Sequence, residues 1–103
     1  MTSSELAQLI ASDLVANRDK LVWLGRPIDQ CLVKPTEIVC LNSHAENQPE
    51  HYWLVFEEGP GQGEGYKVVY DEELGEFGLA VAGDVEPVVV GIYGGFVETL
   101  SSM

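Results

Sequence analysis

The stretch that decides the fold is Tyr66-Lys67-Val68-Val69-Tyr70-Asp71-Glu72-Glu73-Leu74-Gly75-Glu76-Phe77-Gly78-Leu79-Ala80-Val81-Ala82. In its first five residues, large apolar side chains alternate with Lys67 and Val69, which is the period of a strand. A polar segment ending in Gly75 interrupts this pattern, and a second apolar run begins at Phe77. A connection this short joins antiparallel strands, so the stretch predicts a hairpin.

Further strands are expected on both sides of this hairpin. Thr36–Leu41 is rich in β-branched residues, and His51–Glu57 is apolar on both of its alternating faces. Val88–Tyr93 is the last expected strand, and the short apolar run Leu21–Leu24 is a candidate for another. No connection is long enough for a crossover helix, so these strands should pair antiparallel.

Helical signals stand at the two ends of the chain. Thr2 and Glu5 have capping-box spacing, which predicts a helix from about Ser3 to Asn17. The residues expected on its apolar face are Leu6, Leu9, Ile10 and Leu14. Phe96 and Leu100 share one helical face, which predicts a short terminal helix. The expected fold class is therefore α+β: an N-terminal helix packed on a twisted antiparallel sheet of about five or six strands, with a short C-terminal helix. Residues 1–103 should form a single globular domain.

The excess negative charge is confined to the last two-thirds of the chain. Residues 1–34 hold four acids and four bases, whereas residues 35–103 hold thirteen acids and only one base, Lys67. That second part therefore accounts for the whole net charge of −12. Such a surface repels nucleic acid and anionic membranes and attracts basic proteins.

Acidic side chains beside tyrosines are typical of a surface that binds a basic protein, because tyrosines anchor the partner while carboxylates steer it. The candidate partner-binding residues, grouped around two hairpin turns, are Glu57, Glu58, Glu64, Tyr66, Tyr70, Asp71, Glu72, Glu73 and Glu76. The leading hypothesis from the sequence is a non-catalytic acidic protein-binding module whose partner is a basic protein.

The acidic and aromatic segment Gly65–Gly78, together with the layout of a helix followed by strands, resembles small acidic bacterial proteins of the toxin-immunity type. The resemblance implies an inhibitor that neutralises a nuclease or another basic toxin by covering its active site, without catalysis of its own. No residue matches a defining motif, so no functional position is carried over.

Other classes of function stay open at this point. A small-ligand binding domain would place its pocket between the helix and the sheet. A metal-dependent or acid/base hydrolase would draw on the group His44, Glu46, Glu50 and His51. The spacing of that group lacks the HExxH arrangement of zinc enzymes. An oligomeric structural role is the remaining class.

Recognised catalytic and cofactor motifs are missing from the sequence. The glycine-rich segment Gly59–Gly65 matches neither the Walker nor the GxGxxG pattern and predicts a hairpin loop. The acids of residues 71–76 do not follow the calcium-loop pattern, and no GxSxG elbow is present. We therefore expect no cofactor, no metal site and no catalytic residue.

The cysteines and the N-terminus favour a cytoplasmic protein. Cys31 and Cys40 lie in apolar segments and are expected to be buried free thiols. No apolar run approaches the length of a membrane helix, and the N-terminus has no basic signal region.

Overall fold

The computed structural model describes residues 2–16, 32–42, 46, 48–57, 66–81, 83 and 86–100. The elements in chain order are α1 (Ser3–Ala16), β1 (Leu32–Asn42), β2 (Gln48–Glu57), β3 (Tyr66–Asp71), β4 (Glu76–Val81), β5 (Val88–Gly94) and α3 (Phe96–Leu100). They confirm the α+β class, with an N-terminal helix on a five-stranded sheet and a short C-terminal helix. The candidate strand Leu21–Leu24 lies outside the described residues.

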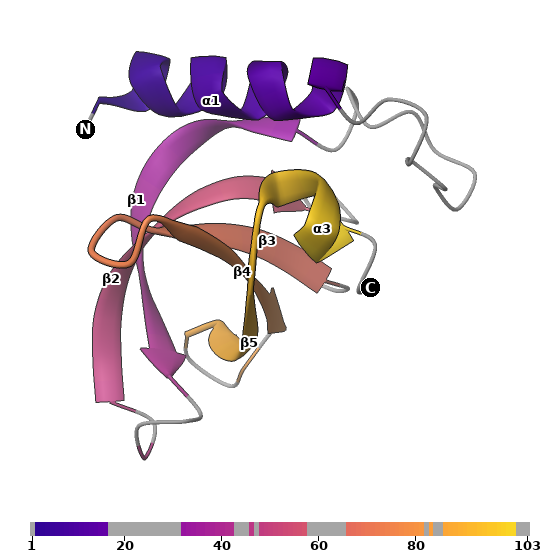
Figure 1. Cartoon of the computed structure of the whole chain (residues 1–103). Helices are drawn as coiled ribbons and strands as arrows, with labels where there is room; N and C mark the ends of the chain where they lie inside the picture. The colour runs from indigo at the N-terminus through magenta and orange to yellow at the C-terminus, as the bar shows by residue number, and fades with distance from the viewer. Residues whose placement is uncertain are drawn as a thin grey trace.

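Each strand pairs antiparallel with the next one along the chain, as the short connections predict. The sheet then closes into a barrel, because β5 meets β1 in a short parallel contact of Leu41 with Val88 and of Asn42 with Val89. When five strands each run antiparallel to the next, the first and the fifth point in the same direction. The contact that closes the barrel is therefore parallel. Figure 1 shows α1 lying across β1 and α3 beside the strongly curved sheet.

The start of α1 is fixed by the predicted capping box. The Glu5 N–H donates to Thr2 Oγ1 at 3.2 Å, and the Thr2 N–H donates to Glu5 Oε1 at 3.1 Å. Leu6 and Ile10 are buried, but Leu9 is 43% exposed, so the expectation that Leu9 faces the core is wrong. The buried stripe on α1 is narrower than predicted because only one side of the helix meets the barrel. Within the described residues, no helix has the length and apolar character of a membrane span.

Two strands begin earlier than the sequence predicts. β1 starts at Leu32 rather than Thr36, and its pairing with β2 shifts register between those residues, around the buried Pro35. A proline has no N–H to donate, so it is tolerated where the ladder is irregular. β2 starts at Gln48 rather than His51, which shortens the connection expected before it.

Two apolar clusters lie on opposite faces of the sheet. The larger one packs the helices against β2, β3 and β4, and its buried residues are Leu6, Ile10, Val55, Phe56, Val68, Tyr70, Phe77, Leu79, Phe96 and Leu100. The smaller one takes residues from all five strands and none from the helices: Cys40, Tyr52, Val69, Ala80 and Val89, with Ile38, Leu54 and Ile92 partly buried beside them. Successive side chains of a strand point to opposite faces, and among the described residues the second cluster is built from the strands alone. We therefore assign it to the interior of the closed barrel.

Cys40 is a buried free thiol in this interior, as predicted, whereas Cys31 lies outside the described residues. Burial raises the pKa of the Cys40 thiol to about 11, the negative charge of Glu86 adds to this shift, and Lys67 opposes it. The thiol therefore stays protonated at neutral pH.

Candidate functional site

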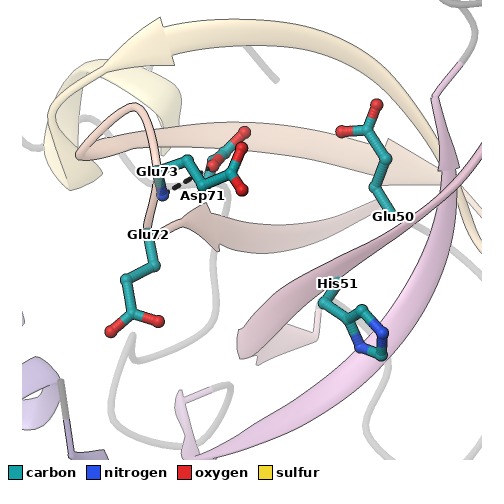
Figure 2. A pocket seen from close by; sticks show the side chains of 5 residues that line it. All are labelled: Glu50, His51, Asp71, Glu72 and Glu73. Carbon is teal, nitrogen blue, oxygen red and sulfur yellow. Dashed lines mark hydrogen bonds between the residues drawn. The ribbon is translucent and has the colours of Figure 1, made fainter.

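A pocket of about 430 Å³ opens where the first part of β2 lies beside the turn between β3 and β4 (Figure 2). It is lined by Glu50, His51, Asp71, Glu72 and Glu73. Four of these five side chains are carboxylates, and neither lysine nor arginine is among the described residues that line it. We call this site the acidic pocket.

Asp71 shapes one wall of the acidic pocket by closing the turn after β3. Its Oδ1 atom accepts hydrogen bonds from the N–H groups of Glu73 at 3.0 Å and Leu74 at 3.2 Å, and its carbonyl accepts from the Gly75 N–H at 2.8 Å. Gly75 has a φ of 69°, a left-handed conformation that glycine adopts at little cost. The turn therefore holds the exposed side chains of Glu72 and Glu73 on a fixed backbone.

Glu50 is oriented by two donors at the mouth of the barrel. Asn42 Nδ2 donates to Glu50 Oε1 at 3.0 Å, and the Tyr52 hydroxyl donates to Glu50 Oε2 at 3.2 Å. Burial of Tyr52, together with the charge of Glu50, raises the pKa of the tyrosine. The hydroxyl therefore remains a donor at neutral pH, and both Glu50 oxygens have partners inside the protein.

His51 does not form an acid/base pair with Glu50. The two residues are neighbours on β2, and Figure 2 shows their side chains pointing in opposite directions, as alternation along a strand requires. The rest of the predicted group is not assembled: Glu46 is exposed in a turn, and His44 lies outside the described residues. In the described part of the chain, no three His, Cys, Asp or Glu side chains are placed to hold a metal ion.

The predicted partner-binding residues divide between the two ends of β3. Asp71, Glu72 and Glu73 lie at one end, and Glu76 is exposed at the start of β4, opposite Asp71 in register. Tyr66, 38% exposed, lies at the other end, roughly 17 Å away over six residues. At that end Glu57 lies 3.8 Å from the ammonium group of the buried Lys67. Glu58 and Glu64 are outside the described residues.

Tyr70 is a correction to the predicted set. Its side chain is only 5% exposed, and its ring centroid lies 4.7 Å from that of Phe77 in the larger apolar cluster. Tyr70 points to the face of the sheet that the helices cover, so it supports the fold and cannot contact a partner.

Glu50 and His51 were not predicted to lie next to the β3–β4 turn. The signal that could have found them is strand register, since Trp53 pairs with Tyr70 in the antiparallel ladder. Residues 50 and 51 therefore continue past the end of β3, where the turn residues that follow it lie.

A second hollow, of about 270 Å³, lies between α1 and the first part of β1, and we call it the helix groove. Its lining residues are Ser3, Ser4, Ala7, Ile10, Leu32, Val33, Lys34 and Pro35. Ser3 Oγ donates to the carbonyl oxygen of Pro35 at 2.9 Å and ties the helix to the strand. Lys34 is exposed, whereas Lys67, the other base in the described part of the chain, is buried.

Comparison of the chain with models of protein families, with curated proteins and with solved structures finds no significant match.

Proposed function

We propose that this protein is a non-catalytic acidic binding module that engages a basic protein partner at the acidic pocket, in the manner of an inhibitor or an immunity protein. The observation that supports this most strongly is that four of the five residues lining one hollow, from β2 and from the β3–β4 turn, carry carboxylates, with no lysine or arginine among its described lining. Residues some twenty positions apart in the chain thus contribute to one negative site.

The chemistry of the pocket suits lysine and arginine side chains. Ionised carboxylates accept charge-assisted hydrogen bonds from ammonium and guanidinium groups, and guanidinium can bind a carboxylate through two parallel bonds. A concave wall of protein also concentrates the field of these charges and accelerates association with a cationic surface. Asp71 and Glu50 are held in place before a partner arrives, which reduces the entropy lost on binding.

The same hydrogen bonds suit a binding role. They fix the positions of Glu50 and Asp71, and each carboxylate keeps acceptor sites for a partner's ammonium or guanidinium group. His51 points away from Glu50, so no carboxylate orients its ring from that side. These groups build the site and supply charge to it.

The test compares two double variants that remove equal charge. Glu72→Gln with Glu73→Gln changes the acidic pocket, and Glu37→Gln with Glu46→Gln removes two exposed acids elsewhere. An arginine-rich peptide serves as the probe, with affinity measured by calorimetry in 50 mM and 300 mM salt. We expect at least a fivefold loss for the pocket variant, less than a twofold loss for the control, and weaker binding at high salt.

Equal losses in the two variants would show that only the overall charge attracts the peptide, and the pocket proposal would then fail. An affinity that is the same in 50 mM and 300 mM salt would contradict the electrostatic basis of the proposal. Both variants keep the backbone acceptors and donors of the turn, so each should fold.

A second candidate function is the binding of a small ligand in the helix groove. The observation that favours it is a hollow of about 270 Å³ in the place that this function requires, between the helix and the sheet. Its lining is mainly aliphatic, as is usual for ligand sites. Saturable shifts of backbone amide NMR signals at Ala7 and Val33 on addition of octan-1-ol would support it.

A further inference from the structure

We propose that the helix groove binds small organic anions, specifically a carboxylate carried on a short aliphatic chain. This inference rests on the second function proposed above and names its ligand class. The groove shares no lining residue with the acidic pocket, and the charged residue in its lining is a lysine rather than a carboxylate.

The shape of the groove fits an aliphatic chain. Its aliphatic lining comes from both elements: Ala7 and the buried Ile10 on α1, and Leu32, Val33 and the buried Pro35 on β1. The volume of about 270 Å³ exceeds the roughly 150 Å³ of a cavity that accepts benzene, and lies just below the range of about 300–1,000 Å³ for drug-sized sites. One short chain or a single ring is therefore the appropriate size.

The volume of the groove limits the length of its ligand. The hydrogen bond from Ser3 Oγ to the Pro35 carbonyl joins α1 to β1 beside it, since both residues line the groove. An extended peptide would need a longer trough than a hollow of about 270 Å³ provides. The groove therefore favours a small molecule over a protein segment.

The charge at the rim selects an anion. Lys34 lines the groove and is the only exposed lysine or arginine in the part of the chain that the structure describes. Ser4, in the first turn of α1, also lines the groove and carries a hydroxyl donor. The nearby carboxylate of Glu5 is engaged with the Thr2 N–H, which completes the capping box. A carboxylate bound in the groove would therefore meet Lys34 as its nearest described cation.

The experiment follows backbone amide NMR signals of the full chain during titration with octanoate, with octan-1-ol as the neutral probe. Octanoate should shift the signals of Ser4, Ala7, Val33 and Lys34 in a saturable way. We expect it to bind more tightly than octan-1-ol, and nonanoate to bind about fourfold more tightly than octanoate, since one more methylene is buried.

Two pairs of variants make the test specific. Lys34→Gln should weaken octanoate binding about two- to fivefold and leave octan-1-ol binding unchanged, while Lys34→Arg should retain octanoate binding. Ala7→Leu should fill the groove and reduce the affinity for both probes at least tenfold. Ala11→Leu, on the same helix but outside the groove, is the matched control and should leave both affinities unchanged. The amide spectrum of each variant reports whether it folds.

The outcomes distinguish the binding of a small ligand in the groove from the preference of the groove for anions. If octan-1-ol and octanoate bind equally and Lys34→Gln affects neither, the groove is an apolar site and the preference for anions is wrong. If neither probe shifts the signals of the groove at millimolar concentration, the small-ligand function fails as well. If Ala7→Leu leaves octanoate binding intact, the anion binds somewhere else and the inference is overturned.

Discussion

The acidic pocket and the helix groove are opposites in the same small protein. The pocket is lined by carboxylates and held by hydrogen bonds in a turn and at the barrel mouth, whereas the groove is lined by aliphatic side chains and carries one lysine. The shape of the pocket depends on individual hydrogen bonds to Glu50 and Asp71. The groove depends on how the helices pack on the sheet, which the apolar cluster beneath them controls.

The difference shows that net charge is a poor guide to what such a surface binds. A total of −12 suggests one uniform field, yet Lys67 is buried beside Glu57 and the exposed Lys34 lies at the groove. The placement of a few charges therefore gives the two sites linings of opposite charge. If the two regions are stabilised independently, a substitution in one should leave the other unchanged.

The largest effect is expected from Phe56→Ala. Phe56 is fully buried, its ring centroid lies 6.2 Å from that of Phe96 in α3, and its removal leaves a cavity under the helices. We expect a loss of about 3–5 kcal/mol in the free energy of unfolding, measured by urea denaturation. Leu74→Ala, at a residue 62% exposed in the β3–β4 turn, is the control and should change stability by less than about 0.5 kcal/mol.

Asp71→Ala should destabilise the turn that forms one wall of the acidic pocket. The change removes the acceptor for two backbone N–H groups and should cost about 1–3 kcal/mol in the free energy of unfolding. Asp71→Asn keeps an acceptor oxygen and should cost less than half as much. Hydrogen exchange should accelerate at the Glu73 and Leu74 amides, while the amides of α1 remain protected. Equal acceleration in α1 would show that the two regions are coupled.

Alkaline pH should lower the free energy of unfolding, because the barrel interior contains the buried Cys40 thiol. The pKa of Cys40 rises from 9.0 to about 11 on folding, so between these values the unfolded chain loses a proton that the folded chain retains. The free energy of unfolding should therefore fall from pH 9 to pH 11 by at most about 1.4 kcal/mol per pH unit for this group. Below pH 9 the contribution of the thiol is constant.

The pKa of Tyr52 is also raised on folding, so the tyrosine adds to the loss of stability at alkaline pH. A Cys40 variant is therefore needed to measure the contribution of the thiol. The difference in stability between the unmodified protein and Cys40→Ala, followed from pH 8 to pH 11, should show the thiol contribution alone. A difference that does not change with pH would contradict the assignment to Cys40.

The smallest effect is expected from Ser3→Ala at the helix groove. The change removes one hydrogen bond to the Pro35 carbonyl and should cost about 0.5–1.5 kcal/mol in the free energy of unfolding. Ser12→Ala, at an exposed position on the same helix, is the control. The cost should be the same at pH 7 and pH 10, because neither group titrates. A cost that grows at pH 10 would link the groove to the titrating interior.

Local signals were sufficient for most of the fold. The capping box at Thr2 and Glu5 predicted the start of α1, and the alternation around Val68, followed by the turn at Gly75, predicted the β3–β4 hairpin. These signals work because they involve residues at most a few positions apart. The early start of β1 was missed, since Pro35 reads as a break and only pairing with β2 makes it part of a strand.

The candidate site was predicted in part. The acids of the β3–β4 turn were identified from sequence, but Tyr70 was assigned to the surface although the helices cover its side of the sheet. Glu50 was considered only as a metal ligand, because its proximity to the turn depends on the register between β2 and β3. The helix groove was expected in outline as a pocket between helix and sheet, without its lysine.

The sequence by itself determined the order of the elements, the antiparallel pairing of neighbouring strands and the concentration of negative charge in the last two-thirds of the chain. These properties follow from side-chain period, turn chemistry and composition. Only the tertiary structure decided the closure of the barrel, the face of the sheet that the helices cover and the positions of the exposed carboxylates and of Lys34. The physical reason is that these features depend on contacts between residues far apart in the chain, and no short-range pattern encodes which of two apolar faces is covered by a helix.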